Sequence, residues 1–147
     1  MAMKKTYTLF LLIISVAIAL TGCVIIERDE IYNNSGQDLT ILVQHSTNST
    51  PHQIKKGETL EFYASFIEIR HGNGTWRYEH KPFALEFHKR ADSKHLIKFY
   101  KRIGGNQILV KLQIQPDGAI YLIPPDFDGP ITDFPEQPEG FPLIPSK

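Results

Sequence analysis

Six histidines are the side chains with the widest chemical range in this chain of 147 residues: His45, His52, His71, His80, His88 and His95. Zinc sites are usually marked by ligands at short fixed spacings, such as two histidines four residues apart on one helix. None of these histidines has such a partner, and only strand pairing across a tight turn would bring His88 near His95. We therefore expect surface histidines, and neither a bound metal nor another cofactor.

Nucleophilic and acid–base chemistry have no local motif in this sequence. There is no G-x-S-x-G elbow of the kind that presents a catalytic serine. The acidic residues are scattered, and none stands in an apolar run that would plainly raise its pKa. The single cysteine, Cys23, follows an apolar run. The sequence therefore predicts that the protein is not an enzyme, while a site assembled from distant strands remains an alternative hypothesis.

Trp76 and Tyr78 lie two residues apart, on one face of an expected strand. Such a pair can form an aromatic platform for a sugar ring or for a partner protein. The competing interpretation places both rings in the core, facing Phe83, Phe87 and Phe99. We favour the core, because a small domain without disulfides needs this apolar area.

Charge is distributed unevenly along the chain. Residues 81–102 hold seven basic side chains against two acidic ones, and residues 126–147 hold five acidic against one basic. The acidic segment could lie back on the basic one, or the basic segment could face anionic lipid, lipopolysaccharide or a partner. The plain alternative is an ordinary solvated surface with a loose tail. The basic residues that we take as candidates for an interaction surface are Lys89, Arg90, Lys94, Lys98 and Lys101.

The last 24 residues contain seven prolines and no hydrophobic periodicity. Proline lacks a backbone donor and breaks strand ladders, so we expect this segment to be extended, polyproline-like or disordered. Phe127, Phe134 and Phe141 recur in it every seven residues. That spacing indicates either a linear docking motif for an aromatic-lined groove on another protein or a flexible extension without a partner.

The beginning of the chain has the layout of a secretory signal peptide. Lys4 and Lys5 precede an apolar run from Leu9 to Leu20 that only Ser15 interrupts. The run is shorter than the roughly 20 apolar residues that a membrane-spanning helix needs. We therefore predict a leader for export rather than a permanent membrane span.

Leu20, Thr21, Gly22 and Cys23 resemble the lipobox of bacterial lipoproteins, matching its leucine, small, glycine and cysteine positions. The resemblance covers only the first 23 residues. It implies that diacylglycerol is attached to the sulfur of Cys23, that the leader is cut before Cys23, and that the new amino terminus is acylated. One acyl chain binds a bilayer reversibly, whereas two or more hold stably. The alternative is a chance cysteine at the end of an ordinary signal peptide.

Removal of the leader leaves 14 basic and 16 acidic side chains, a balance that is not typical of nucleic-acid binding. No cysteine remains besides Cys23, so no internal disulfide can form and one modest apolar core must hold the domain. In lipoproteins of the enteric type, an aspartate after the cysteine favours retention in the inner membrane. Val24 stands there instead, so we favour the outer membrane if the cell has one.

Alternating apolar residues predict an all-β fold of about eight short strands, arranged as a small antiparallel β-sandwich or a partly open barrel. Four segments carry turn signals: 33–37, Asn73-Gly74, 104–106 and 116–118. The first predicts an opening hairpin, and the second predicts a hairpin with a type I′ turn. The polar stretch 46–52 is expected to be a loop.

Two segments leave a choice. The alternation changes phase between Leu60 and Ile69, which predicts a bulge or break near Ser65 and Phe66. The stretch from Pro82 to Ala91 fits either a strand or a short helix.

These patterns predict a signal peptide (1–22), a lipidated tether (23–27), an antiparallel β domain (28–123) and a proline-rich acidic extension (124–147). We expect a lipid-anchored protein of the cell envelope that acts as a non-catalytic binding or structural module for another envelope component. Its partners would be the membrane, through Cys23, and an envelope protein, and not nucleic acid. The alternatives are an inhibitor or immunity lipoprotein that neutralises a secreted enzyme or toxin, and an envelope hydrolase.

Overall fold

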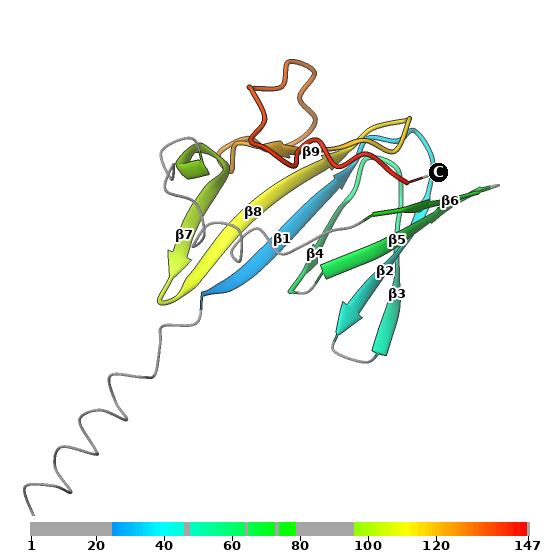
Figure 1. Cartoon of the computed structure of the whole chain (residues 1–147), viewed down its shortest axis with the longest axis horizontal. Coiled ribbons are helices and arrows are strands. Elements are labelled where there is room, and N and C mark those ends of the chain that lie inside the picture. Colours follow the sequence, from blue (N-terminus) through cyan, green and yellow to red (C-terminus); the bar gives the residue numbers. More distant parts are fainter. Residues whose placement is uncertain (1–24, 46–47, 64, 73, 79–95, 147) are drawn as a thin grey trace, which may run out of the picture.

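Two β-sheets packed face to face form the body of the protein (Figure 1). The computed structural model describes residues 25–45, 48–63, 65–72, 74–78 and 96–146. The expectation of an all-β sandwich is therefore confirmed. The predicted leader, Cys23 and the stretch from Pro82 to Ala91 lie outside the described residues.

Sheet A is built around β8, which has a neighbour along each edge. Its strands are β4 (Thr59–Phe62), β1 (Ile26–Asn33), β8 (Gln107–Ile114), β7 (Tyr100–Gly104) and β9 (Ile120–Ile123). β1 runs along one edge of β8, whereas β7 and β9 share the other edge, β7 beside its first half and β9 beside its second. A short 3-10 helix, η1 (Ile97–Phe99), leads into β7.

Sheet B has the order β3-β2-β5-β6. Its strands are β3 (Asn48–Ile54), β2 (Leu39–His45), β5 (Ser65–His71) and β6 (Gly74–Arg77). All of its neighbouring strands are antiparallel. In sheet A the central pair, β1 and β8, is parallel, which differs from the antiparallel arrangement expected from the sequence.

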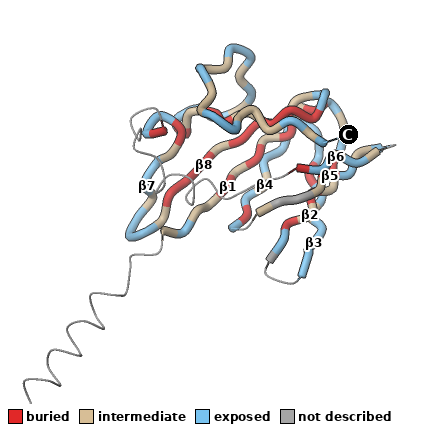
Figure 2. The backbone as a smooth tube through the Cα atoms, in the orientation of Figure 1, coloured by how far each residue is buried: buried red, intermediate tan, exposed pale blue. Residues whose placement is uncertain are grey.

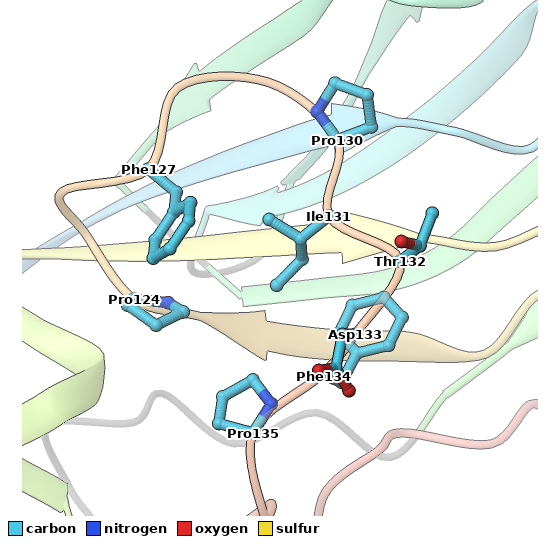
Figure 3. Close-up of a pocket in the computed structure, with 8 residues that line it drawn as sticks. All are labelled: Pro124, Phe127, Pro130, Ile131, Thr132, Asp133, Phe134 and Pro135. Carbon is cyan, nitrogen blue, oxygen red and sulfur yellow. The ribbon is translucent and has the colours of Figure 1, made fainter.

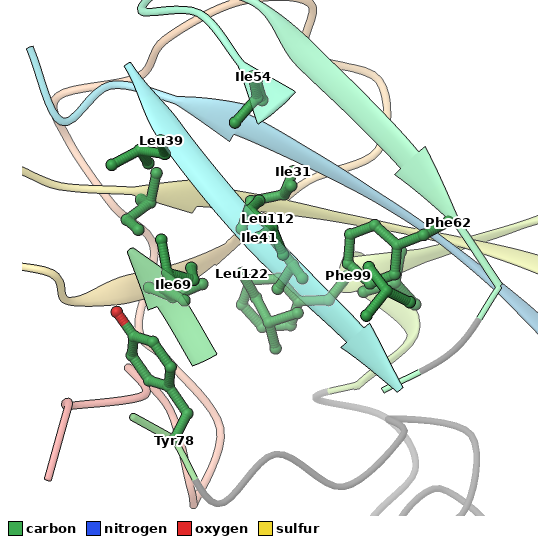
Figure 4. Close-up of a cluster of buried hydrophobic side chains, with 14 of the residues drawn as sticks. Ile31, Leu39, Ile41, Ile54, Phe62, Ile69, Tyr78, Phe99, Leu112 and Leu122 are labelled. Atoms are coloured by element: carbon green, nitrogen blue, oxygen red, sulfur yellow. The ribbon is translucent and has the colours of Figure 1, made fainter. Parts of the chain in front are cut away.

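The core lies between the two sheets and consists of alternate residues from each strand (Figure 4). Successive side chains of a strand point to opposite faces, so every second residue can be buried. On β8, these inward residues are the four that the sequence placed on one face: Ile108, Val110, Leu112 and Ile114. From sheet B, Leu39, Ile41, Val43, Ile54 and Ile69 join the same cluster.

The predicted opening hairpin is wrong, because β1 and β2 belong to different sheets. Residues 34–38 carry the chain from one sheet to the other, and the buried side chain of Asn33 holds this crossing. Its Nδ2 donates to the Gln37 carbonyl at 2.8 Å and to the Ile54 carbonyl at 3.3 Å, and its Oδ1 accepts from the Ser35 hydroxyl at 2.6 Å. An asparagine at a turn satisfies the backbone of a bend as well as that of a hairpin, so the residue types alone did not separate the two.

The predicted loop over residues 46–52 is also wrong in its second half, which is the edge strand β3. Pro51 lies opposite Leu42 in this strand. Proline is tolerated on an edge strand, where its missing N–H faces solvent. Polarity and proline therefore marked an exposed edge of sheet B here.

The phase change between Leu60 and Ile69 has two structural causes. First, the chain leaves sheet A at the end of β4 and enters sheet B with β5. Second, β5 contains a bulge at Ile67, because Val43 pairs with Phe66 while Leu42 pairs with Glu68. The predicted bulge or break is confirmed, one residue beyond the expected place.

Three predicted turns connect antiparallel strands as expected. They join β5 to β6, β7 to β8, and β8 to β9. In the first, His71 pairs with Gly74, so the two-residue loop lies one position earlier than the Asn73-Gly74 pair that signalled it.

Tyr78 belongs to the core, with 6% of its surface exposed. Trp76 is partly buried and packs against the core cluster. The core interpretation of this pair is thus confirmed for Tyr78. The Tyr78 hydroxyl donates to the Gly118 carbonyl at 2.7 Å. Burial and the nearby Asp117 carboxylate raise the pKa of Tyr78, which keeps the hydroxyl protonated as a donor.

Gly118 is required by both its backbone and its neighbour. Its φ of +86° lies in the left-handed region, and a Cβ at this position would come within 2.8 Å of the Trp76 ring. Gly129 has a similar φ of +100° but nothing within 4 Å of the same position. The two glycines thus separate the cost of backbone strain from that of side-chain crowding.

We expect Gly118→Ala to lower the free energy of unfolding by about 1–3 kcal/mol more than Gly129→Ala does, because only the first must also displace a packed ring. Urea denaturation of both variants and the parent measures the difference. Equal losses in the two variants would show that the Trp76 ring moves aside freely.

Candidate functional site

The strap, residues 124–146, begins over sheet A on the face turned away from the core, and its end reaches sheet B, where Ser146 pairs with Arg77 (Figures 1 and 2). Gln113 and Ile123 point to this outer face and are nevertheless 0% and 2% exposed. β8 is therefore buried on both faces, by sheet B on one side and by the strap on the other. The strap is irregular, as the prolines predicted, and it belongs to the folded body.

Gln113 fastens the first half of the strap. Its Nε2 donates to the Ile131 carbonyl at 2.8 Å, and its Oε1 accepts from the Ile131 N–H at 2.9 Å. A primary amide carries one acceptor and two donors, so it can bond to both backbone groups of one residue as a neighbouring strand would. Gln113 is fully buried and Ile131 is half-buried, so the two bonds are partly shielded from water.

Gln137 fastens the second half of the strap. Here the side-chain amide belongs to the strap and the backbone groups that it binds belong to sheet A. Its Oε1 accepts from the Leu122 N–H at 2.9 Å, and its Nε2 donates to the Leu122 carbonyl at 3.1 Å. Ile120 and Leu143 exchange two backbone bonds of 2.9 and 2.8 Å beside it. The backbone N–H and C=O groups of Ile120 and Leu122, which face away from β8, are therefore all hydrogen-bonded. This protects the free edge of β9 from pairing with another chain.

Ion pairs join the strap to the strands below it. The Lys111 ammonium donates to Asp128 at 2.8 Å and to the Phe127 carbonyl at 2.9 Å, and Lys101 donates to Asp126 at 3.1 Å. The bond from Lys111 lowers the pKa of the Asp128 carboxyl below its usual value. The two aspartates are exposed, so these pairs contribute little stability and chiefly fix the position of the loop.

The strap encloses an open hollow of about 560 Å³ between its first turn and its middle (Figure 3). Prolines, phenylalanines and an isoleucine supply most of its lining: Pro124, Phe127, Pro130, Ile131, Phe134 and Pro135, with Thr132 and Asp133 completing it. Phe127 is 53% exposed, which is unusual for so large an apolar ring. Asp133 is the only titratable residue of the lining, so the hollow offers contact area rather than catalytic groups.

The three phenylalanines of the strap, predicted as a repeat, have different environments. Phe127 lines the hollow and is half exposed. Phe134 lines it too and stacks on Tyr121 with ring centroids 4.1 Å apart, and Phe141 packs against the core cluster. The seven-residue spacing thus places Phe127 and Phe134 together and Phe141 apart from them.

Of the five basic residues predicted as an interaction surface, the structure describes two, Lys98 and Lys101. Lys101 binds Asp126, in agreement with the hypothesis that the acidic segment lies back on the basic one, and the Lys98 ammonium lies 5.2 Å from the centre of the Phe99 ring. Lys89, Arg90 and Lys94 lie outside the described residues, as does Cys23. Lys111, which binds the strap most closely, was not among the predicted residues, because one lysine in a strand is no signal by itself.

Among the described histidines, His71 stacks on Trp76 with ring centroids 4.1 Å apart. His80, His88 and His95 are outside the described ranges. In the part of the chain that the structure describes, no group of three histidine, cysteine or acidic side chains gathers as a metal site would require. Over the same residues, no helix has the length and apolar character to cross a bilayer.

Asp29 corrects the expectation that no carboxyl stands in an apolar setting. It is 3% exposed, on the face of β1 that also carries Ile31, and opposite Phe62 of β4. Burial raises its pKa well above the usual value, and the neighbouring Glu27 adds to this through its charge and a hydrogen bond. The signal was present in the sequence, because Asp29 and Ile31 share a parity in the first strand.

Comparison of the chain with protein-family models, with curated proteins and with solved structures found no match in any of the three.

We expect Gln113→Ala to speed hydrogen exchange at the Ile131 amide roughly 5- to 150-fold, because the loss of both part-buried bonds costs about 1–3 kcal/mol of local stability. Exchange followed by mass spectrometry measures this for residues 124–135. Gln53→Ala, at an exposed position of β3, is the matched control and should leave the strap unchanged. Equal exchange in both variants would mean that Gln113 does not hold the strap.

We expect Asp29→Asn to make the protein more stable near neutral pH. A carboxyl whose pKa is raised by folding binds its proton more tightly in the folded state, so stability falls as pH rises from the ordinary pKa of about 3.9 toward the raised value. Asparagine does not titrate, so it removes this contribution to the slope of the free energy of unfolding against pH. Urea denaturation between pH 4 and pH 8 measures it, with the exposed Glu61→Gln as control. A slope that persists in Asp29→Asn would assign it to another group.

Proposed function

We propose that this protein is a lipoprotein of the cell envelope, anchored through Cys23, that binds a segment of another envelope protein in the hollow of the strap. The observation that carries the proposal is an open apolar hollow, lined by the half-exposed Phe127, on a loop fixed to the body by Gln113 and Lys111. The resemblance of the first 23 residues to a lipobox supports the anchor.

A loop that is already held in shape is suited to binding. A partner that meets a flexible loop must order it, and each immobilised side chain costs about 0.5–1.5 kcal/mol. Here the bonds to Ile131 and Phe127 hold the loop in place before any partner arrives. The hydrogen bonds that keep the strap on sheet A therefore also prepare its outer surface.

The lining of the hollow indicates the chemistry of the partner. Proline and phenylalanine rings fit an apolar or aromatic side chain, as in other grooves that receive extended peptides. The described part of the strap contains five acidic residues and no basic one. Asp133 and Glu136 are exposed close to the hollow. We infer that the partner segment carries an apolar side chain with lysine or arginine beside it.

Affinity capture tests this role. Lipidated protein is extracted from its own cells in mild detergent, and proteins that co-purify are identified by mass spectrometry. We expect Phe127→Ser to lose a partner that the parent retains, because it removes the most exposed apolar ring of the hollow. Ile144→Ser is the matched control, since Ile144 is an exposed apolar residue of the strap that does not line the hollow.

Retention of every partner by Phe127→Ser, or an equal loss in both variants, would contradict binding at the hollow. The anchor is tested separately by supplying cells with a labelled fatty acid. We expect the parent to be labelled and Cys23→Ser to be unlabelled and released from the membrane.

A further inference from the structure

We propose that Ile26 and Tyr63 form a foot that rests in the headgroup region of the bilayer, so that the sandwich stands on one end with the strap loop held away from the membrane. This inference rests on the anchor in the proposed function, and it adds an orientation and a second membrane contact. The foot is defined here as the side chains of Ile26 and Tyr63 together with the β7–β8 turn beside them.

The position of the anchor along the chain leads to this end of the molecule. Cys23 precedes Ile26 by three residues, which span at most about 10 Å when fully extended. Ile26 pairs with Gln107, and its N–H donates to the Asn106 carbonyl at 2.8 Å. The start of β1 must therefore lie within about 10 Å of the lipid-bearing residue, and the β7–β8 turn is hydrogen-bonded to it.

This end exposes apolar side chains on the outer face of sheet A. Ile26 is 45% exposed and Tyr63 is 55% exposed, and they are two of the five large apolar residues that are so exposed among those described. They lie on the same face of two neighbouring strands, because the pairing of Asp29 with Phe62 places Tyr63 opposite Arg28, two residues along β1 from Ile26. A single exposed apolar residue is common on protein surfaces and needs no explanation. Two such residues beside a lipid anchor lie next to the bilayer that holds the anchor.

The chemistry of the two residues suits the headgroup region. Tyrosine is enriched where membrane meets water, because its ring is apolar and its hydroxyl is polar. Ile26 adds an aliphatic side chain to the same contact. Multiple acyl chains already hold the protein, so the contribution of the foot is to fix the orientation rather than the affinity.

The strap loop lies away from the foot. In Figure 1 the start of β1 and the β7–β8 turn are at the lower end of sheet A, and the loop of residues 124–135 is at the top. Lys111, which binds Asp128, pairs with Glu30, roughly 13 Å along β1 from Ile26. Lys101, which binds Asp126, lies at the level of Arg28, roughly 7 Å from Ile26, so the base of the loop is nearer to the foot than its tip. A sandwich standing on its foot would therefore present the hollow and its acidic residues to the compartment, and not to an anionic bilayer.

Fluorescence quenching in vesicles tests the inference. Lipidated protein is reconstituted in phosphatidylethanolamine and phosphatidylglycerol vesicles that contain a headgroup-spin-labelled lipid. Asn106→Cys and Thr132→Cys each provide one thiol for a fluorophore, at the foot and in the strap. Both are examined with and without the pair Ile26→Ser and Tyr63→Ser, and circular dichroism verifies the fold of each variant.

We expect strong quenching at position 106, none at position 132, and a loss of quenching at 106 when Ile26 and Tyr63 are both serine. Equal quenching at the two positions, absent quenching at 106 in vesicle-bound protein, or quenching at 106 that the two serines leave unchanged would each overturn the foot. A fluorophore found on Cys23 would instead show that the cysteine carries no lipid, in which case the anchor itself fails.

Discussion

The strap has seven prolines in 24 residues and cannot form a continuous β-strand along sheet A, and the outer face of this sheet depends on how the strap is held instead. Two side-chain amides hold it. Gln113 bonds to both backbone groups of Ile131, and Gln137 bonds to both backbone groups of Leu122. The strap needs a free N–H only at the few positions where it touches the sheet, and non-proline residues occupy those positions.

The same arrangement explains why Gln113 can be fully buried. A buried amide without partners would cost a substantial part of the stability of a small domain. Its two bonds to Ile131 satisfy it, and in return they hold the loop whose outer surface forms the hollow. One buried residue thus links the packing of sheet A to the shape of the candidate binding surface.

Much of the fold could be predicted from alternation and turn residues, because these depend on neighbours in sequence. The inward face of β8, the bulge in β5 and the turn at Gly118 were all marked locally. The crossing after Asn33 was not, since an asparagine-rich turn serves a hairpin and a sheet-to-sheet bend equally. Nor was β3, where polar residues and Pro51 are compatible with an exposed edge.

The candidate site was harder to predict, because its contacts join residues far apart in the chain. Phe127 was named from spacing, but Gln113, Gln137 and Lys111 were not. A glutamine on the outer face of a strand resembles any solvated residue until the segment that covers it is known. The burial of Asp29 could have been predicted from the sequence, because residues 29 and 31 of one strand share a face and Ile31 is an expected core residue.

The parallel pair of β1 and β8 has a consequence for the life of the chain before it is folded. Residues 26–33 must find residues 107–114, so the centre of sheet A cannot close before Ile114 has been synthesised. Contacts so distant in sequence form slowly. A nascent chain of this topology therefore remains unfolded for longer than one built from local hairpins.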